Sequence, residues 1–405
     1  MRIVFYCQHV LGVGHMFRSL EIVKALKDHE VILVTGGAEV DFEPPANMTR
    51  IQLPGLMMDA NFTRFIPLEE GAEVDEVLIR RLKLFKEIMT RYQPDIFMVE
   101  LFPFGRKKFR FELLPILKKV RKGEYGKCRA VCSVRDILVE KKDMQRQVER
   151  VHGYLNPNFD HVLVHSDPNL VRLDETFPGV EGIVPEVHYT GYVARKPDPA
   201  VTAALAGELN LGDTPLVVAS VGGGHIGRDL LRGVMTASPV LNETHPHRMM
   251  VFAGPYAEED EFLRLQAEAE AHPHITVKRF TKRFLAYLDL AALSVSLGGY
   301  NTTMNLLATN TFGLMYPFLQ NREQNMRARR IEDKGGLKVI TEEDLGPERL
   351  VPLMREGLDR KAAPLHLDLD GAENSARILE KVYLNMQTGD MQTGDMQTGD
   401  MQAGD

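Results

Sequence analysis

Short apolar runs alternate with helical segments along almost the whole chain, and this alternation stops once and then restarts. The first series of runs, which we predict to be strands, covers residues 2–8, 31–37, 50–54, 95–100, 129–134 and 161–166. Between them, segments such as 73–93 carry apolar residues at helical spacing. Strands that alternate with helices form parallel sheets with helices on both faces, so the sequence predicts an α/β fold.

A stretch rich in Pro, Ala and Gly interrupts the pattern at residues 194–215, and further strand-like runs follow it. A chain of 405 residues is long enough for two domains with separate cores. We therefore predict two doubly wound, Rossmann-like domains with a cleft between them. The expected parts are a first domain over 1–192, a linker over 193–214, a second domain over 215–369 and a terminal helix over 370–385.

Composition argues against several classes of protein. A net charge of -7 argues against general nucleic-acid binding. No N-terminal apolar segment resembles a secretion signal, and no apolar run approaches the length of a membrane span. The cysteines Cys7, Cys128 and Cys132 lack zinc-ligand spacing, so we expect free thiols and no metal site. These features predict a cytoplasmic protein.

The C-terminal segment 386–405 repeats a five-residue unit, with MQTGD three times and MQAGD once. With this period, the methionines do not line up on one face of a helix or of a strand. Two interpretations stay open. Gly-Asp recurrence is typical of a disordered tail, whereas bundled tails from several subunits would make the segment an oligomerisation element of a homo-oligomer. We favour the second.

The segment VLGVGHMFRSLEIVKAL, residues 10–26, joins the first predicted strand to a helix. A dinucleotide-binding fingerprint requires a third glycine in this loop and an acidic residue at the end of the second strand. After Gly12 and Gly14, the third position holds Phe17, and the second strand ends in the residues TGG. The loop therefore argues against a nicotinamide-dependent enzyme.

Two glycine loops in the second half lie where a predicted strand turns into a helix. One contains Gly222, Gly223 and Gly224, and the other contains Gly298 and Gly299. Backbone N–H groups at a helix start bind anions because they lack partners within the helix, and the helix dipole adds to the attraction. Two such loops predict a site for a nucleoside diphosphate that needs no metal.

Three segments carry a resemblance to a known family: GVGHMFRSLEIVKAL, ASVGGGHIG and LGGYNTTMNLLATNTFGLMYPFLQNREQN. On these segments the chain resembles the GT-B glycosyltransferases of family 28, the family of the peptidoglycan-precursor N-acetylglucosaminyltransferases. The similarity covers nearly everything before the repeats and is more specific in the second half. It is closer still to a branch of predicted glycosyltransferases with the segments LFPFGR and SVRDI.

The resemblance implies a metal-independent, inverting transferase without a cofactor. Such an enzyme moves a hexose-type sugar from a nucleoside diphosphate sugar, most often UDP-linked, to a hydroxyl acceptor. In the second domain, Phe280 would frame the base, and Glu323 and Gln324 would hold sugar hydroxyls. Family members often carry a ribose-binding glutamate where this chain has Asn305. The implied donor-binding residues are Gly222, Gly223, Gly224, Phe280, Gly298, Gly299, Tyr300, Asn301, Thr302, Asn305, Glu323 and Gln324.

His15 follows the first glycine loop, at the carboxyl end of the first predicted strand. A transferase must deprotonate its acceptor hydroxyl, and a histidine with a pKa near neutral suits that task. Contact with the leaving diphosphate and a structural helix cap stay open as alternatives. Glu100 and Asp136 come at the ends of two further strands, so either can assist or replace His15 as the base. The expected contacts to phosphate or acceptor are Gly12, Gly14, Arg18 and Arg135.

Residues 101–122 mix four phenylalanines, Phe102, Phe104, Phe109 and Phe111, with clustered Lys and Arg. Such a segment suits an anionic membrane surface or a lipid-linked acceptor. Phenylalanines at helical spacing are also typical of a hydrophobic core. Both interpretations stay open, namely core packing and peripheral contact with the inner face of the membrane.

Two other functions suit the same architecture. A UDP-sugar 2-epimerase uses two such domains but no acceptor, and a non-catalytic scaffold would bind the sugar nucleotide and oligomerise through its tail. Turnover distinguishes the three. A transferase consumes its donor only with an acceptor present, an epimerase needs none, and a scaffold consumes nothing.

Overall fold

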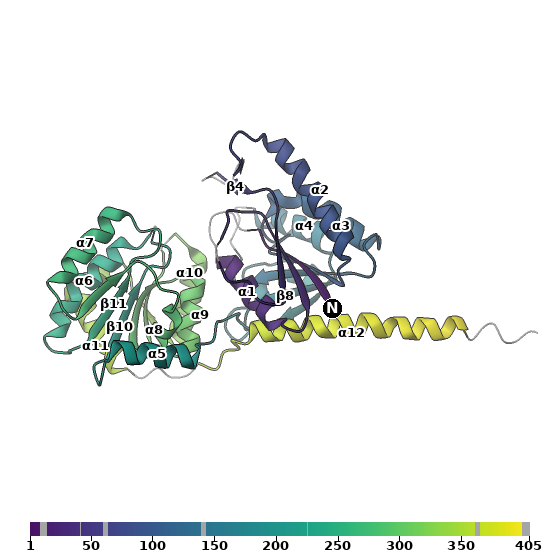
Figure 1. Ribbon diagram of the computed structural model, residues 1–405. Coiled ribbons are helices and arrows are strands. Elements are labelled where there is room, and N and C mark those ends of the chain that lie inside the picture. The colour runs from purple at the N-terminus through teal and green to yellow at the C-terminus, as the bar shows by residue number, and fades with distance from the viewer. Residues whose placement is uncertain are drawn as a thin grey trace, which may run out of the picture. The chain divides into compact units, whose positions relative to one another are not determined.

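The computed structural model describes residues 1–8, 14–40, 42–59, 64–138, 143–224, 226–318, 320–360 and 365–398. These residues form two compact units, each built around a parallel sheet (Figure 1). Unit 1 contains Met1–Val193 together with the chain from Asp370 onward, and unit 2 contains Ala194–Leu369. The predicted α/β class and the two doubly wound halves are confirmed.

Unit 1 has a seven-stranded sheet in which all neighbouring strands are parallel. In sheet order, its strands are β3 (Met48–Gln52), β2 (Glu30–Thr35), β1 (Arg2–Tyr6), β6 (Ile96–Glu100), β7 (Arg129–Arg135), β8 (His161–His165) and β9 (Glu186–Tyr189). A separate antiparallel pair consists of β4 (Leu56–Met58) and β5 (Phe65–Pro67). The central strands are nearly continuous apolar runs because helices cover both faces of the sheet.

Two groups of helices cover this sheet. α1 (Gly14–Ala25) and α12 (Gly371–Thr398) share a core with one face. On the other face lie α2 (Val74–Tyr92), α3 (Arg110–Arg121) and α4 (Met144–Leu155). Unit 1 also contains the short 3-10 helices η1 (Lys107–Phe109), η2 (Leu173–Glu175) and η3 (Val180–Gly182). Although α12 is far from the rest of unit 1 in the sequence, it docks on this unit, where Nε2 of His29 lies 2.9 Å from Oε1 of Glu380.

Unit 2 has a six-stranded parallel sheet. In sheet order, its strands are β12 (Ile275–Lys278), β11 (Arg248–Phe252), β10 (Leu216–Ser220), β13 (Ala291–Leu297), β14 (Gly313–Tyr316) and β15 (Leu337–Val339). One core joins the sheet to α6 (Arg228–Asn242), α7 (Glu259–Glu270) and α11 (Pro347–Asp359). The remaining helices are α5 (Pro199–Leu209), α8 (Phe284–Leu290), α9 (Tyr300–Thr309), α10 (Arg322–Asp333) and η4 (Glu342–Asp344).

The borders of the units differ from the expected ones in two places. The stretch 193–214, expected as a linker, contains α5, which packs against α8 and belongs to unit 2. Asp198 caps this helix by accepting from the N–H of Ala200 at 2.9 Å, and Pro199 takes the first helical position, where proline is favoured. At the other end, α12 continues past residue 385 to Thr398, so its backbone includes part of the repeats. Residues 399–405 lie outside the described residues.

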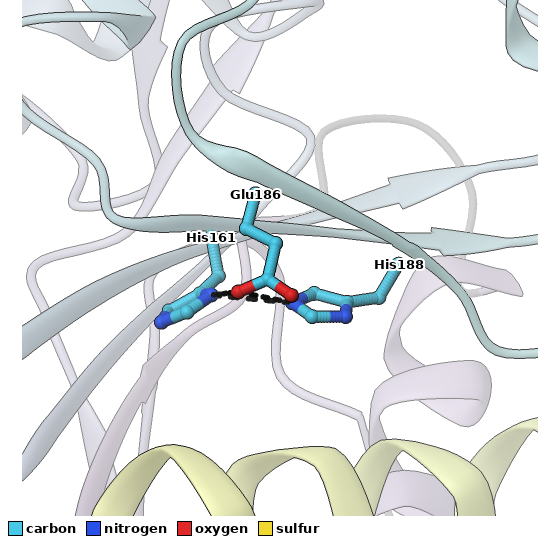
Figure 2. Close-up of side chains that lie close together, drawn as sticks. All are labelled: His161, Glu186 and His188. Atoms are coloured by element: carbon cyan, nitrogen blue, oxygen red, sulfur yellow. Dashed lines mark hydrogen bonds and ion pairs between the residues drawn. The ribbon is translucent and has the colours of Figure 1, made fainter. Parts of the chain in front are cut away.

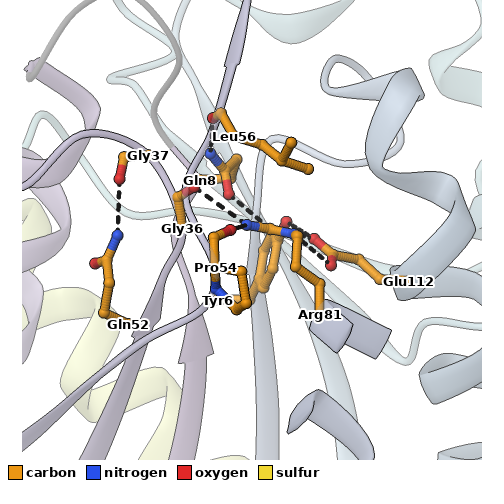
Figure 3. Close-up of polar contacts among 9 residues, drawn as sticks. All are labelled: Tyr6, Gln8, Gly36, Gly37, Gln52, Pro54, Leu56, Arg81 and Glu112. Atoms are coloured by element: carbon orange, nitrogen blue, oxygen red, sulfur yellow. Dashed lines mark hydrogen bonds and ion pairs between the residues drawn. The ribbon is translucent and has the colours of Figure 1, made fainter. Parts of the chain in front are cut away.

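A fully buried arginine ties α2 to the sheet of unit 1 (Figure 3). Nε and Nη2 of Arg81 donate to the two carboxylate oxygens of Glu112 on α3, at 3.0 and 2.6 Å. The other acceptors of this guanidinium are the side chain of Gln8 and the carbonyls of Gly36 and Pro54. A Cβ on Gly36 would lie 2.3 Å from Arg81 Nη1, which explains the glycine at this point. Buried charges need such complete pairing to be stable.

None of the helices in the described ranges is long and apolar enough to cross a membrane. The three cysteines are free, as predicted. Burial raises the pKa of Cys7 and of Cys128 to about 12, which keeps these thiols protonated and unreactive at neutral pH.

Candidate functional site

The strand order of unit 1 reverses between β1 and β6. From β1 the chain proceeds outward to β2 and β3, and from β6 it proceeds to β7, β8 and β9. Ligands of α/β proteins bind at the carboxyl ends of the two strands that flank such a switch point. His15 is the second residue of α1, which follows β1, and Glu100 ends β6, so both predicted residues lie there. Gly14 is the first residue of α1, whereas Gly12 lies outside the described residues.

His15, Arg18 and Glu100 contact one another. Nδ1 of His15 lies 2.6 Å from Oε1 of Glu100, and Nη2 of Arg18 donates to the same oxygen at 2.7 Å. Glu100 is fully buried and Arg18 nearly so, whereas the His15 side chain keeps 20% of its surface exposed. The first turn of α1 thus brings one cation and one imidazole to a single buried carboxylate, and only the imidazole reaches solvent.

Opposing effects set the charges of this cluster. Burial alone would raise the pKa of Glu100, but His15, Arg18 and Arg106 outweigh it and hold that pKa well below its usual range. Burial lowers the pKa of His15 below its ordinary value of 6.5, and the charge of Glu100 opposes this only in part. At neutral pH the cluster therefore contains a carboxylate and a neutral imidazole. If Nδ1–H donates to Glu100, the basic lone pair is on Nε2.

The next strand ends carry the other residues predicted in unit 1. β7, which pairs with β6, ends at Arg135. Asp136 follows this strand and is fully buried. One strand further along the sheet, His165 lies between the hydroxyls of Ser133, at 2.7 Å, and Thr190, at 2.9 Å. Burial lowers the pKa of His165 to about 3, so it is a neutral, structural histidine.

A second switch point lies in unit 2, between β10 and β13. These strands are neighbours, with Ser220 beside Ser296 near their carboxyl ends. Both predicted glycine loops begin there, since Gly222 to Gly224 follow β10, and Gly298 and Gly299 follow β13. The structure thus brings together two loops that are far apart in the sequence.

Close backbone packing requires glycine in the first of these loops. Gly224 has a φ of 95°, and a Cβ there would lie 2.7 Å from the carbonyl oxygen of Ala253. Across the contact, Gly254 has a φ of 93°, and its Cβ would lie 2.4 Å from the nitrogen of Gly224. Positive φ and this lack of space both exclude other residues. A loop held in this way keeps its N–H groups in fixed positions.

The second loop ends at the N-terminus of α9. Gly299 is the N-cap residue and lacks a side chain that would satisfy the N–H groups of the first turn. A Cβ at Gly299 would meet no atom within 4 Å, so the space beside this helix start is open. Tyr300, Asn301 and Thr302 form the first turn. The arrangement suits an anion, as the sequence predicts.

The side chains of the remaining predicted donor residues differ in how free they are. Asn305 is partly buried, one turn after the exposed Asn301 on α9. Phe280 follows β12 and is 60% exposed. Oε1 of Glu323 accepts from the buried Arg327 at 2.9 Å, and Oε1 of Gln324 accepts from the N–H of Phe318 at 3.0 Å. Both predicted sugar-binding side chains are therefore already engaged within unit 2.

The structure confirms the core interpretation for the phenylalanines of residues 101–122. Phe102, Phe104 and Phe109 are buried in the core of unit 1, and Phe111 packs against it. The three buried rings are not available for membrane insertion while the unit is folded. Basic side chains remain at the surface, where Lys107, Lys108, Arg110, Asp143, Arg146 and Arg150 line an open hollow of about 550 Å³.

Residues 217–381 match the family described as the glycosyltransferase family 28 C-terminal domain. The chain carries a family 28 glycosyltransferase domain. This domain includes both glycine loops of unit 2 and the start of α12. The predicted family resemblance is therefore confirmed for the second half of the chain.

One curated relative matches a part of the chain. An uncharacterised glycosyltransferase of Methanopyrus kandleri is 24% identical over 170 residues, which make up 41% of this chain and 45% of that protein. The chain thus spans less than half the length of this relative.

Solved structures match nearly the whole chain. MurG of Acinetobacter baumannii has a TM-score of 0.57 and 15% identity, covering 94% of this chain and 100% of that chain. A protein assigned as a UDP-N-acetylglucosamine 2-epimerase from Listeria monocytogenes has a TM-score of 0.58 and 15% identity, covering 94% and 95%. At these identities the likeness establishes the fold alone, and the family 28 domain belongs to a chain with two GT-B-type halves.

Three features of these sites carry no signal in the sequence. The contact of Arg18 with Glu100 depends on how α1 lies against β6, and spacing along the chain does not reveal it. Glu323 and Arg327 are four residues apart on α10 and form an ion pair. Every helix contains many residue pairs at this spacing, so the spacing alone does not reveal which of them are in contact. Gly254 and Gly224 lie in two different loops that pack closely together. Because glycine is common in loops, neither residue alone indicates this contact.

Proposed function

We propose that this chain is a metal-independent, inverting glycosyltransferase. It moves a hexose-type sugar from a nucleoside diphosphate sugar, with UDP as the expected nucleotide, to a hydroxyl acceptor. The observation that carries the proposal is the contact of His15 with Glu100 at the switch point of unit 1. The family 28 domain supports a nucleotide sugar as the donor.

In this proposal His15 is the general base. Glu100 accepts Nδ1–H and thereby fixes the tautomer in which Nε2 is basic. Nε2 takes the proton of the acceptor hydroxyl while the hydroxyl oxygen forms a bond to the anomeric carbon of the donor. The bond from that carbon to the diphosphate breaks, and the diphosphate leaves with the electron pair. Attack opposite the leaving group inverts the anomeric configuration.

The leaving diphosphate needs stabilisation of its negative charge. We assign this role to the backbone N–H groups of the loop after β10 and of the first turn of α9, where the open space at Gly299 admits a phosphate. Fixed N–H donors of this kind supply the stabilisation without a metal ion. Asn305 takes the place of a ribose-binding glutamate, and its amide offers hydrogen bonds without a full charge.

A second candidate function is supported by the similar fold of the protein assigned as a UDP-N-acetylglucosamine 2-epimerase. An epimerase would bind the same class of donor but use no acceptor. In that case His15 would act on the sugar itself rather than on a separate hydroxyl.

One assay separates these functions. The protein is incubated with UDP-, GDP-, dTDP- and CDP-linked sugars, with and without a panel of sugars, phenols and lipid extract as acceptors, and the released nucleotide is measured. The proposal expects release that depends on the acceptor. Conversion of a UDP-sugar to its epimer without an acceptor would favour the epimerase, and no consumption under any condition would favour a binding scaffold.

A further inference from the structure

Two histidines and a glutamate lie together on strands β8 and β9 of unit 1 (Figure 2). His161 and Glu186 are opposite each other on the paired strands, and His188 follows Glu186 by two residues on the same face. Nδ1 of His161 lies 3.2 Å from Nε2 of His188. Oε2 of Glu186 lies 3.5 Å from the first nitrogen and 3.6 Å from the second.

These separations correspond to the edges of a tetrahedral metal site. Zinc binds imidazole nitrogen at about 2.0–2.1 Å and carboxylate oxygen at about 2.0–2.2 Å, so its ligand atoms lie about 3.3–3.5 Å apart. An octahedral ion with similar bonds would hold adjacent ligand atoms at about 3.0 Å. The observed 3.2, 3.5 and 3.6 Å suit a tetrahedral ion with three ligands from the chain. Water would supply the fourth.

A hydrogen bond between the two imidazoles accounts for their own contact. It does not account for the Glu186 oxygen, which approaches both of the same ring nitrogens. Two imidazoles and a carboxylate form a ligand set that zinc accepts, whereas magnesium and calcium prefer oxygen ligands throughout. Among the described residues, this is the one group of three His, Cys, Asp or Glu side chains with ligand atoms close enough to hold an ion.

Charged groups face the cluster from two sides. Asp160 precedes His161, and its carboxylate accepts from Arg121 at 2.8 Å and from Arg129 at 3.2 Å. On α12, the exposed side chain of Lys381 places a positive charge near His188. Removal of Lys381 therefore offers a variant in which a bound cation is less opposed.

The cluster is separate from the proposed catalytic site. His161 and Glu186 are the first residues of β8 and β9, so they lie at the amino ends of these strands. His15 and Glu100 lie at the carboxyl ends of the sheet. Because β9 is an edge strand that pairs with β8 alone, an ion held here would fasten that edge.

We propose that His161, Glu186 and His188 bind a zinc ion that ties the edge strand β9 to β8 and stabilises unit 1. The site is structural and independent of glycosyl transfer.

The test uses the full chain without a histidine tag, stripped with a chelator and dialysed. Zinc binding is measured by calorimetry, and bound metal by mass spectrometry after desalting. We expect about one zinc per chain, a higher unfolding temperature with zinc, and the visible spectrum of a tetrahedral ion when cobalt is substituted. His161→Ala and His188→Ala each weaken binding by at least about tenfold, Glu186→Gln weakens it less, and Lys381→Ala strengthens it.

The matched control is His366→Ala, which removes an exposed histidine of unit 2 and leaves zinc binding unchanged. Circular dichroism checks that each variant is folded. The proposal is overturned if the wild type binds no zinc, or if His161→Ala and His188→Ala bind it as the wild type does, which would mean adventitious binding only. An octahedral cobalt spectrum would likewise contradict the tetrahedral site.

Discussion

Nδ1 of His15 lies 2.6 Å from Oε1 of Glu100, although the two residues are 85 positions apart in the chain. The doubly wound topology explains this contact, because β1 and β6 are neighbours whose carboxyl ends flank the switch point of unit 1. The pair combines a buried carboxylate with a partly exposed imidazole. We propose that this carboxylate orients the imidazole as a general base.

Replacement of His15 by alanine should lower turnover by about two to four orders of magnitude, the range expected for loss of a general base. Binding of the nucleoside diphosphate should persist, because the proposed donor loops are in unit 2. Steady-state turnover and calorimetric titration with the diphosphate measure the two quantities separately. Unchanged turnover in a folded His15→Ala protein would rule out this residue as the base.

Glu100→Gln should change the pH dependence as well as the rate. The base must be neutral, so the rate rises with pH through the pKa of His15, which lies below its ordinary value of 6.5. The charge of Glu100 raises the pKa of His15. Its removal should therefore move the acid limb of the pH–rate profile to lower pH, while the maximal rate falls because the tautomer is no longer fixed. An acid limb that stays in place would show that Glu100 does not act through His15.

Two glycines of unit 2 should respond differently to alanine. Gly299→Ala adds a methyl group where nothing lies within 4 Å, so the fold should tolerate it, but the methyl occupies the space proposed for a phosphate. Diphosphate affinity should fall by about tenfold or more, equal to about 1.4 kcal/mol. Gly254→Ala instead places a Cβ 2.4 Å from Gly224 N at a positive φ, so it should lower the unfolding temperature. Calorimetric titration and thermal unfolding give both readouts, and equal affinities for wild type and Gly299→Ala would contradict the phosphate site.

Loss of one partner of the buried ion pair Arg81–Glu112 should destabilise unit 1. Arg81→Met leaves the Glu112 carboxylate buried without its cation, which costs about 3–5 kcal/mol. Arg81→Met combined with Glu112→Gln removes that uncompensated charge, so the double variant should be more stable than the single one. Scanning calorimetry measures both. A double variant that is less stable than Arg81→Met would indicate that the charge is not the source of the loss.

The sequence predicted the sheets and placed His15 and Glu100 at the same sheet edge, but it did not predict the contacts between them. Runs such as IFMVE and RAVCSV identify buried parallel strands, and residues at the carboxyl ends of such strands share one sheet edge, so the sequence places His15 and Glu100 on the same edge. The helix at 199–209 was missed because Pro, Ala and Gly suggested a linker, although Pro199 opens the helix and Asp198 caps it. The cluster of His161, Glu186 and His188 has no sequence signature, since it depends on the register of β8 against β9.

The proposed mechanism requires the family 28 domain to bind a nucleoside diphosphate donor. Calorimetric titration with UDP tests it most directly, with GDP, dTDP and CDP as comparators, on the wild type and on Asn305→Glu. We expect binding of UDP in the micromolar range and tighter binding by Asn305→Glu, because a carboxylate forms stronger hydrogen bonds to ribose hydroxyls than an amide does. No binding of any of the four diphosphates by the wild type would contradict the account.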